Sequence, residues 1–285
     1  MAALPTSPPV TAPPLRPFLK WAGGKTRLLR HILPHVPTEF VDYHEPFLGG
    51  GAMFFAVRDR LLGAAHLHDL NEVLVNAWQR VQEDPAGLNE ALTWYAERDC
   101  KEFYYSQRTA RPDTLVGQAA WFIYLNQTSW NGLWRVNKHG VFNVPWGDRP
   151  FRGIEEETLF RLSDSLIGAT IDANDFRVTL EKPSAGDFVY IDPPYLPLSD
   201  TSKFYLYTEK RFRGPDLCEL AELCHQLTGR GVHWIMSNRD TPQVRDLFPD
   251  NEVVRFTTRR SVAAQNRRDV EAADSPEALI LGPAR

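Results

Sequence analysis

The alternation of short apolar runs with helical patterns is the feature that most constrains the fold of this chain. Several of these runs are continuously apolar, which is typical of strands that helices cover on both faces. Turn residues bound the runs, which lie at 40–45, 66–69, 166–171, 188–192, 232–237, 253–257 and 278–281. Strands that alternate with helices predict an α/β fold with an open, mostly parallel sheet.

One long stretch, roughly 70–165, breaks this alternation, and its length of about 95 residues far exceeds an ordinary crossover connection. Most of the stretch has helical patterns, over 70–83, 86–107 and 115–126. After them, residues 133–144 form two short alternating runs around a Gly-containing turn, which predicts a β-hairpin. We therefore expect an inserted subdomain.

Composition and cysteine usage narrow the class of protein. With 43% hydrophobic and 24% charged residues, the chain is neither disordered nor a coiled coil nor collagen-like. No window approaches the ~18 apolar residues of a membrane helix, so no membrane partner is expected. The three cysteines lack C-x-x-C spacing, which favours a reducing, cytoplasmic setting and predicts no metal site. Residues 1–17 hold six prolines and predict a disordered tail.

The net charge of −4 conceals an uneven distribution. Four segments, 15–30, 127–152, 203–213 and 255–268, together carry 18 basic and two acidic residues, so the rest of the chain carries −20. An acidic body with basic loops is compatible with DNA binding through one face.

A glycine-rich turn follows the first expected strand. Residues 45–55 read EPFLGGGAMFF, where Glu45 ends the strand and Gly49 to Gly51 let the backbone approach a ligand. Asp69 ends the next expected strand, where an acid accepts hydrogen bonds from ribose hydroxyls in dinucleotide-type folds. The pattern favours an adenosine-containing ligand; the alternative is a structural turn with Asp69 as a helix cap.

The tetrapeptide DPPY, Asp192 to Tyr195, comes directly after an apolar strand. Consecutive prolines hold the backbone extended and remove two donors, so carbonyls point outward at the sheet edge. The carboxylate of Asp192 and the carbonyl of Pro193 can accept both hydrogens of an exocyclic amino group, and Tyr195 offers a stacking face.

Further candidates are basic or aromatic. The segment 18–29, FLKWAGGKTRLL, contains GKT, but a P-loop needs glycine where Leu19 stands. That leaves Trp21 and Lys25 as ligand contacts, or Lys25 as an ordinary surface residue. The expected hairpin carries side chains that can read bases, and residues 255–268 form an acid-free run suited to phosphates. Alternatively, the basic run is merely solvated, and so is the hairpin, with Trp130 and Trp134 partly in a core. These residues are Trp130, Asn131, Arg135, Lys138 and Asn143 in the hairpin, and Arg255, Arg259, Arg260, Arg267 and Arg268 in the run.

The order of these motifs resembles the Dam-type (D12 class, alpha group) family of DNA adenine-N6 methyltransferases. The similarity covers residues 18–270 and follows the order of glycine-rich site, inserted domain and DPPY, in the segments FLKWAGGK, EPFLGGGAMFF, HDLN, NQTSWNGLWRVNKHGVFNVPWG, DPPYLPLSDTSKFYLY, MSNRD and TRRSVAAQNRR. One departure is QNRR after Arg259-Arg260-Ser261, where the family has an Asn-Gly-Gly type loop. This departure leaves the phosphate contacts of that loop open.

The resemblance implies a seven-stranded S-adenosylmethionine-dependent methyltransferase (Rossmann-like) sheet with an inserted, mainly helical recognition subdomain. The implied division is a catalytic domain at 18–69 and 160–285 and a DNA target-recognition subdomain at 70–159. The implied cofactor contacts are Trp21, Lys25, Glu45, Gly49, Gly51, Asp69, Asp175, Phe176 and Asp192. The implied catalytic residues are Asp192, Pro193, Pro194 and Tyr195, and the implied DNA contacts are Trp130, Asn131, Arg135, Lys138, Ser199, Thr201, Phe204, Tyr207, Arg259 and Arg260.

The implied activity is methylation of adenine N6 in duplex DNA by base flipping, with GATC as target and no metal required. A cognate restriction endonuclease and a cytoplasmic, nucleoid-associated location fit this activity. Three alternatives stay open: a cytosine-N4 methyltransferase, a non-catalytic DNA-binding protein, and a nucleotide-dependent oxidoreductase. The last leaves DPPY and the basic hairpin unexplained.

Overall fold

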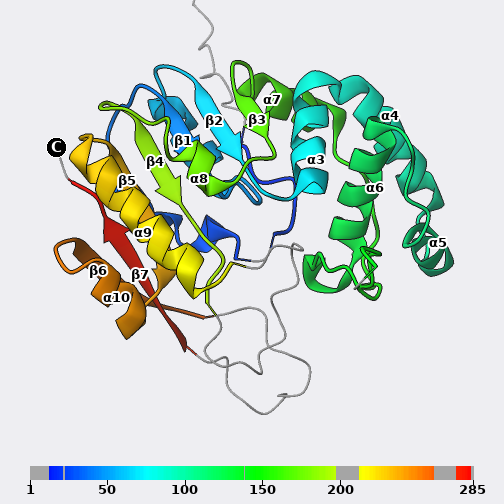
Figure 1. Ribbon diagram of the computed structural model, residues 1–285. Coiled ribbons are helices and arrows are strands. Elements are labelled where there is room, and N and C mark those ends of the chain that lie inside the picture. Colours follow the sequence, from blue (N-terminus) through cyan, green and yellow to red (C-terminus); the bar gives the residue numbers. More distant parts are fainter. Residues whose placement is uncertain (1–12, 22, 138, 197–211, 260–273, 284–285) are drawn as a thin grey trace, which may run out of the picture.

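The computed structural model describes residues 13–21, 23–137, 139–196, 212–259 and 274–283, with the backbone alone described at 258, 259, 274 and 275. Its centre is a seven-stranded sheet in the order β3-β2-β1-β4-β5-β7-β6 (Figure 1). The strands are β1 (Tyr43–Glu45), β2 (Ala65–His68), β3 (Thr170–Asp172), β4 (Phe188–Ile191), β5 (His233–Arg239), β6 (Glu252–Arg259) and β7 (Asp274–Leu281).

The sheet is mixed, and only its last strands depart from parallel pairing. The first five strands in the order pair in parallel, and β7 is inserted antiparallel between β5 and β6. This architecture confirms the predicted α/β class and the seven strands. The strand expected at 166–171 was placed too early, because Leu166 caps the preceding helix and only Thr170–Asp172 pairs with β2.

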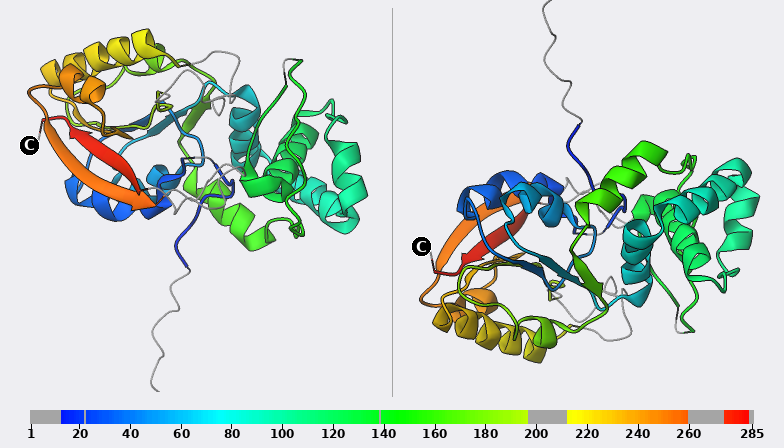
Figure 2. Two further views of the ribbon diagram at one scale, coloured as in Figure 1. Left: turned by 90° about the horizontal axis from the view of Figure 1, so that it is seen from below. Right: turned by 90° about the horizontal axis from the view of Figure 1, so that it is seen from above.

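Two apolar cores lie on the two faces of the sheet, because successive side chains of a strand point to opposite faces. Within β4, Phe188 and Tyr190 belong to the larger core, while Val189 and Ile191 belong to the smaller one. Helix α2 (Ala52–Val57) packs into the larger core, and α9 (Gly214–Gly229) covers the smaller one. Figure 2 shows α9 and α10 (Pro242–Leu247) on the opposite side of the sheet from α1 (Leu29–Ile32) and α2.

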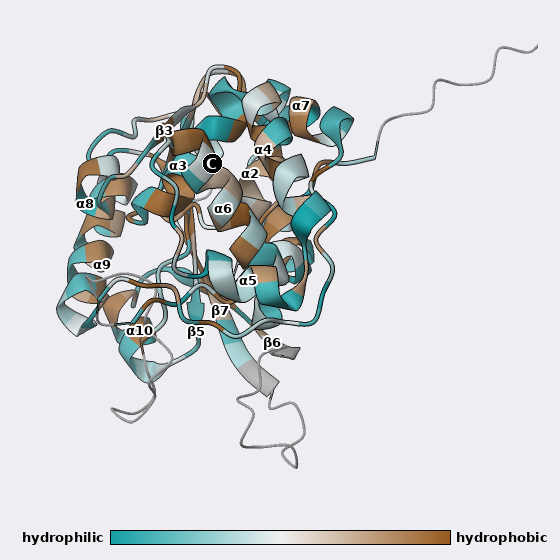
Figure 3. Cartoon of the chain, turned by 90° about the vertical axis from the view of Figure 1, so that its right-hand side faces the viewer, coloured by the Kyte–Doolittle hydropathy of each residue, from teal (hydrophilic) through white to brown (hydrophobic). Residues whose placement is uncertain are grey.

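A helical bundle interrupts the sheet between β2 and β3. It contains α3 (Glu72–Glu83), α4 (Pro85–Arg98), α5 (Lys101–Gln107), α6 (Leu115–Thr128) and α7 (Glu156–Ser165). Apolar residues run through these helices (Figure 3). Helix α6 is buried on nearly every side, from Ala119 to Asn126, because α3 and α4 pack against it. A helix that is apolar all round belongs in the middle of a bundle.

The helix predicted over 86–107 is two helices, which corrects the sequence prediction. Asp99 and Cys100 have extended backbones and separate α4 from α5. The Asp99 carboxylate accepts hydrogen bonds from the Tyr124 hydroxyl (2.9 Å) and from the Phe151 backbone N–H (2.6 Å). These tertiary bonds compensate for the interrupted helix.

The expected hairpin at 133–144 folds back on itself without forming two strands. A single antiparallel bridge joins Val136 to Phe142, and the Asn143 N–H donates to the Arg135 carbonyl (3.1 Å). Trp134 is buried against Phe122 and Phe142, so part of the segment serves as core. The buried indole therefore holds the loop in place, with little help from backbone hydrogen bonds between its two halves.

Within the described ranges, no helix has both the length and the apolar character needed to cross a membrane.

One buried amide ties the segment before the first helix to the bundle. Asn126 of α6 is fully buried. Its side-chain oxygen accepts from the Lys20 N–H (2.9 Å), and its amide nitrogen donates to the carbonyls of Lys20 (2.7 Å) and Gly132 (3.2 Å). A single side chain therefore satisfies three backbone groups that belong to two separate segments.

Replacing this amide, Asn126→Ala, leaves those backbone groups unpaired in the interior. Because an unpaired buried polar group costs roughly 1–3 kcal/mol, we expect the free energy of unfolding to fall by about 3 kcal/mol. Urea denaturation measures the change. Gln118→Ala on the same helix is the control, since the Gln118 side chain makes only exposed hydrogen bonds and its loss should cost about 0.5 kcal/mol or less. Equal losses in the two variants would contradict this role for Asn126.

Candidate functional site

The carboxyl ends of the parallel strands gather the candidate residues. Glu45 ends β1, Asp69 follows β2, and Asp192 follows β4. Because these strands are neighbours that run in the same direction, their ends meet at one edge of the sheet, where ligands bind in open α/β folds.

The glycine turn after β1 is enclosed from three directions. The Gly49 N–H donates to Asp69 Oδ2 (3.0 Å), and the Trp78 indole N–H donates to the Gly49 carbonyl (3.1 Å). A Cβ at Gly49, whose φ is +48°, would lie 2.6 Å from the Trp21 ring. Only glycine combines this backbone angle with so close an approach.

The same constraint holds two residues further along. Gly51 has a φ of +68°, and a Cβ there would lie 2.6 Å from the Trp78 ring. Trp78 belongs to α3, so the bundle supports the glycine turn directly.

Of the two carboxyl groups beside the turn, Glu45 is buried and Asp69 is half-buried. Asp69 accepts from Gly49 with one oxygen and from the Asn71 N–H (2.9 Å) with the other, and burial raises its pKa. Glu45 accepts from the Tyr43 hydroxyl (2.8 Å), and burial raises the pKa of Glu45 well above its usual range. The site therefore holds one buried and one half-buried acidic group side by side.

Asp192 is held by two partners. Lys25 Nζ forms an ion pair with Asp192 Oδ2 (2.7 Å), and the Ser237 hydroxyl donates to Oδ1 (2.9 Å). Ser237 shares a further hydrogen bond with the Tyr190 hydroxyl (3.0 Å). The side chain of Lys25 is only 8% exposed, which strengthens the ion pair relative to a surface pair.

Tyr195 is fixed at its hydroxyl. This hydroxyl donates to Glu277 Oε2 (2.8 Å), and Lys25 Nζ lies 5.1 Å from the ring centroid. Burial, together with the nearby carboxylates of Asp192 and Glu277, raises the pKa of Tyr195, so the phenol stays neutral. Between Asp192 and Tyr195, Pro193 is buried and Pro194 is exposed.

Three supporting residues, Ser237, Glu277 and Tyr190, escaped the sequence reasoning. A signal was present for two of them, because Ser237 and Glu277 are buried polar residues directly beside the buried apolar stretches of β5 and β7. Such residues usually have a partner across the sheet.

Asp175 and Phe176 flank the site after β3. Asp175 caps α8 (Phe176–Thr179) by accepting from the Arg177 N–H (3.0 Å), and it also pairs with the Arg177 guanidinium. Phe176 is buried and stacks on Phe47 at a centroid distance of 5.6 Å. Together Phe47 and Phe176 supply an apolar wall.

The candidate DNA contacts are only partly described. Trp130 is 40% exposed, Asn131 is exposed with a φ of 55°, and Arg135 Nε donates to the Asn143 side chain (2.7 Å). Arg255 is exposed and approaches Asp240 at 3.7 Å. Lys138, Ser199, Thr201, Phe204, Tyr207, Arg260, Arg267, Arg268 and the side chain of Arg259 lie outside the described residues.

Comparison with known proteins gives a consistent answer. The family model for D12 class N6 adenine-specific DNA methyltransferase matches residues 21–262. The chain is 35% identical over 261 residues to the type II methyltransferase M1.LlaDCHI of Lactococcus lactis subsp. cremoris, with 88% of this chain and 91% of that protein covered. It is 37% identical over 243 residues to the type II methyltransferase M.MjaIII of Methanocaldococcus jannaschii (79% and 84% covered), and 33% identical over 264 residues to a DNA adenine methylase of Vibrio cholerae (89% and 94% covered).

The buried Glu45 carboxyl gives the ligand-free protein a specific pH dependence. A carboxyl whose pKa is raised in the folded state contributes full stability below its unfolded pKa, about 4.5, and loses it as the pH rises toward the folded value. Glu45→Gln removes this titration while keeping an acceptor for Tyr43. We therefore expect the stability advantage of Glu45→Gln to grow between pH 5 and pH 8, by up to about 1.4 kcal/mol per pH unit.

Chemical denaturation across that pH range measures this difference. Glu39→Gln, at an exposed position, is the control and should follow the unmodified protein. If the stability of Glu45→Gln and of the unmodified protein changed in parallel with pH, ionisation of the buried carboxyl would not destabilise the fold.

Proposed function

This chain belongs to the family of D12 class N6 adenine-specific DNA methyltransferases, and we propose that it methylates adenine within GATC in duplex DNA, using Asp192 to Tyr195 to hold a base rotated out of the helix. The enzyme is a site-specific adenine-N6 DNA methyltransferase, EC 2.1.1.72, that uses S-adenosylmethionine. The target sequence, the base flipping and the residue assignments are the proposal.

The position of Asp192 carries this proposal. Its carboxylate is fixed by Lys25 and Ser237 at the sheet edge beside the glycine turn. On this assignment, Asp192 and the Pro193 carbonyl each accept one hydrogen of the adenine amino group, so that the nitrogen lone pair faces the methyl donor. The neutral ring of Tyr195, whose hydroxyl Glu277 holds, stacks on the base.

The residues around the glycine turn fit S-adenosylmethionine by their chemistry. Asp69 suits the ribose hydroxyls, the Phe47 and Phe176 rings suit a planar adenine, and Lys25 suits a carboxylate. When bound, the cofactor supplies a methyl group on a sulfonium, which is a strong leaving group. The contribution of the protein is then mainly positioning, and no covalent nucleophile is needed.

Extrusion of the target base costs a few kcal/mol and needs compensating contacts. We assign these contacts to the exposed part of 130–143, with Trp130 stacking on or replacing bases and Arg135 and Asn131 reading base edges. Lys138, Ser199, Thr201, Tyr207, Arg259 and Arg260 are assigned to the DNA on the family motifs alone.

The proposed division keeps catalysis at 18–69 and 160–285 and target recognition at 70–159. Helix α7 spans the second boundary and packs on α3 and α4, so the two parts meet over an extensive apolar contact. A cognate restriction endonuclease is proposed because two similar proteins are type II methyltransferases. The site of action is then the cytoplasmic nucleoid.

Replacing the carboxylate, Asp192→Ala, should abolish methylation, with a loss in kcat of about 10³-fold or more, because the amino group loses an acceptor aligned with the methyl donor. Cofactor affinity should change by about tenfold or less, since the other contacts stay. Transfer of labelled methyl groups to DNA and calorimetric titration of the cofactor measure the two effects. Asp172→Ala, an exposed acid at the end of β3, is the control. Normal methylation by Asp192→Ala would refute the assignment.

The target sequence is tested with duplexes that differ at one position. A duplex with a single GATC should accept labelled methyl, and duplexes with GTTC or CATG in its place should accept about 10²-fold less. Nucleoside analysis should identify N6-methyladenine. Equal methylation of another sequence would refute GATC alone, whereas N4-methylcytosine, or no product on any DNA, would refute the adenine-N6 activity.

A further inference from the structure

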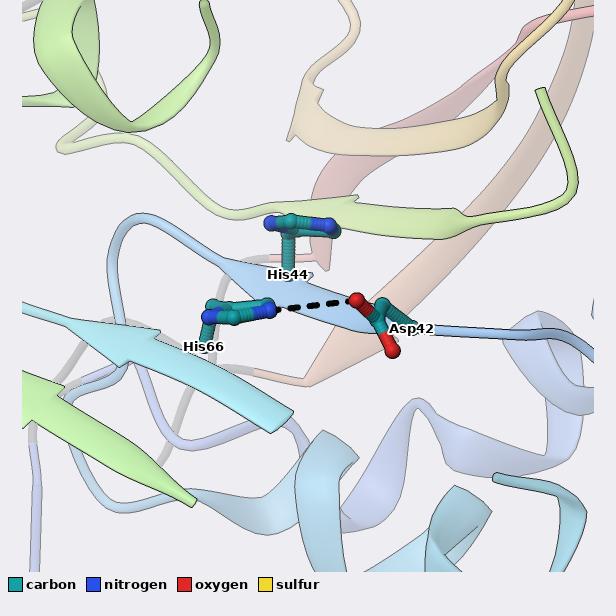
Figure 4. A group of neighbouring side chains, drawn as sticks. All are labelled: Asp42, His44 and His66. Atoms are coloured by element: carbon teal, nitrogen blue, oxygen red, sulfur yellow. Dashed lines mark hydrogen bonds and ion pairs between the residues drawn. The ribbon is translucent and has the colours of Figure 1, made fainter. Parts of the chain in front are cut away.

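A second polar cluster lies toward the amino ends of the same strands, away from the candidate active site. Its members are Asp42, just before β1, His44 within β1, and His66 within β2 (Figure 4). His44 and His66 are partners in the register of β1 and β2, which places both imidazoles on one face of the sheet. We propose that Asp42, His44 and His66 bind one divalent transition-metal ion of the zinc class.

The donor atoms lie close together, and the two imidazole rings stack with 4.6 Å between their centroids, so one ring must turn before both can bind the same ion. One donor atom from each residue lies within 4.8 Å of the other two. His66 Nε2 is 3.3 Å from Asp42 Oδ2, and His44 Nε2 is 3.4 Å from Asp187 Oδ2. These contacts are longer than the ~2.7–2.9 Å of a charge-assisted hydrogen bond. The distance between the two proposed ligands His66 and Asp42 equals the roughly 3.3 Å between two ligands of a tetrahedral zinc ion with bonds of ~2.0 Å.

The buried imidazole of His44 has a contact with Asp187 Oδ2 at 3.4 Å but no aligned hydrogen bond. Its side chain is 5% exposed, and neither ring nitrogen forms a hydrogen bond with any described residue. A buried polar group without a hydrogen bond is uncommon in native structures, and a role in binding an ion is one of its standard explanations.

A second layer of contacts orients the ligands. The Thr170 hydroxyl lies 3.0 Å from His66 Nδ1, which leaves Nε2 facing Asp42. The Ala64 N–H donates to Asp42 Oδ1 (2.7 Å), which leaves Oδ2 facing His66. Metal-binding histidines and carboxylates are usually held in this way through the atom that does not bind the metal.

The charge of the cluster also favours a cation. Asp42 and Asp187 both border it, and no described lysine or arginine forms an ion pair with either carboxylate. With neutral imidazoles the group carries two negative charges, which one divalent ion neutralises. Two nitrogen ligands with carboxylate oxygen suit zinc, cobalt or nickel, whereas magnesium and calcium prefer oxygen alone.

The site is separate from the methyl transfer. The candidate catalytic groups lie at the carboxyl ends of β1, β2 and β4, while these ligands lie near the amino ends. The ion would join β1 to β2 beside the turn that leads into β4, and would stabilise the folded chain.

The test uses the full-length protein without a histidine tag, treated with a chelator and then dialysed. Competition of Zn²⁺ against a chromophoric chelator should show one ion per chain with a dissociation constant of about 10 μM or tighter. Co²⁺ in place of Zn²⁺ should give the visible absorption of a four-coordinate ion. His66→Ala and Asp42→Asn should each weaken binding at least about 100-fold, and His225→Ala, at an exposed histidine of α9, should leave it unchanged.

Thr170→Val provides a test that keeps every ligand and changes an exposed position, so its folding is not in question. It should weaken Zn²⁺ binding about tenfold, because the imidazole of His66 loses its orienting partner. Methylation by the metal-free protein should stay unchanged in this variant. A stoichiometry of zero, or equal affinity in His66→Ala and the unmodified protein, would overturn the proposal and leave the methyltransferase assignment intact.

Discussion

The backbone of Gly49 is the point on which the arrangement of the site depends. Its N–H binds Asp69 after β2, its carbonyl binds Trp78 of the helical bundle, and the Trp21 ring occupies the space where a side chain would lie. Three segments that are far apart in sequence are thus positioned against one residue without a side chain. Since hydrogen bonds and contact distances tolerate little displacement, a shift of this turn would move all three.

The inserted bundle therefore also supports the candidate active site. Trp78 supports the glycine turn from one side, and Asn126 holds the backbone of Lys20, next to Trp21, from the other. The same Asn126 amide reaches Gly132, directly after the exposed Trp130 and Asn131. The larger core includes residues of β1, α2, α3, α6 and α7 without interruption. On the proposed assignment, the cofactor loop and the recognition turn are thus held by the same buried side chain.

The features that neighbouring residues encode were predicted well from the sequence. Continuous apolar runs located β4 and β5 well, and the glycine turn, Asp69 and DPPY lie where strand ends were expected, because each is encoded by adjacent residues. The break at Asp99 was missed because its compensation comes from Tyr124 and Phe151, far along the chain. The expected hairpin is instead a loop anchored by Trp134, because burial of the indole took precedence over the alternating pattern. The partners of Ser237 and Glu277 could not be predicted, because they lie on or just after β4, a separate strand. The ligands of the proposed metal site come from two segments, Asp42 with His44 and the distant His66, without any motif spacing.

The acidic character of the candidate active site follows from the same packing. Glu45 is buried and Asp69 is half-buried beside the glycine turn, and removal from water raises the pKa of each. Asp192 and Glu277 lie close by, with Lys25 paired to Asp192. Holding several carboxyl groups away from water disfavours their charged forms, and a bound cation offsets that cost. A sulfonium cofactor supplies such a charge, and its product after methyl transfer does not. On the proposed assignment, the groups that hold the reactants together thus also favour exchange of the spent cofactor for a fresh one.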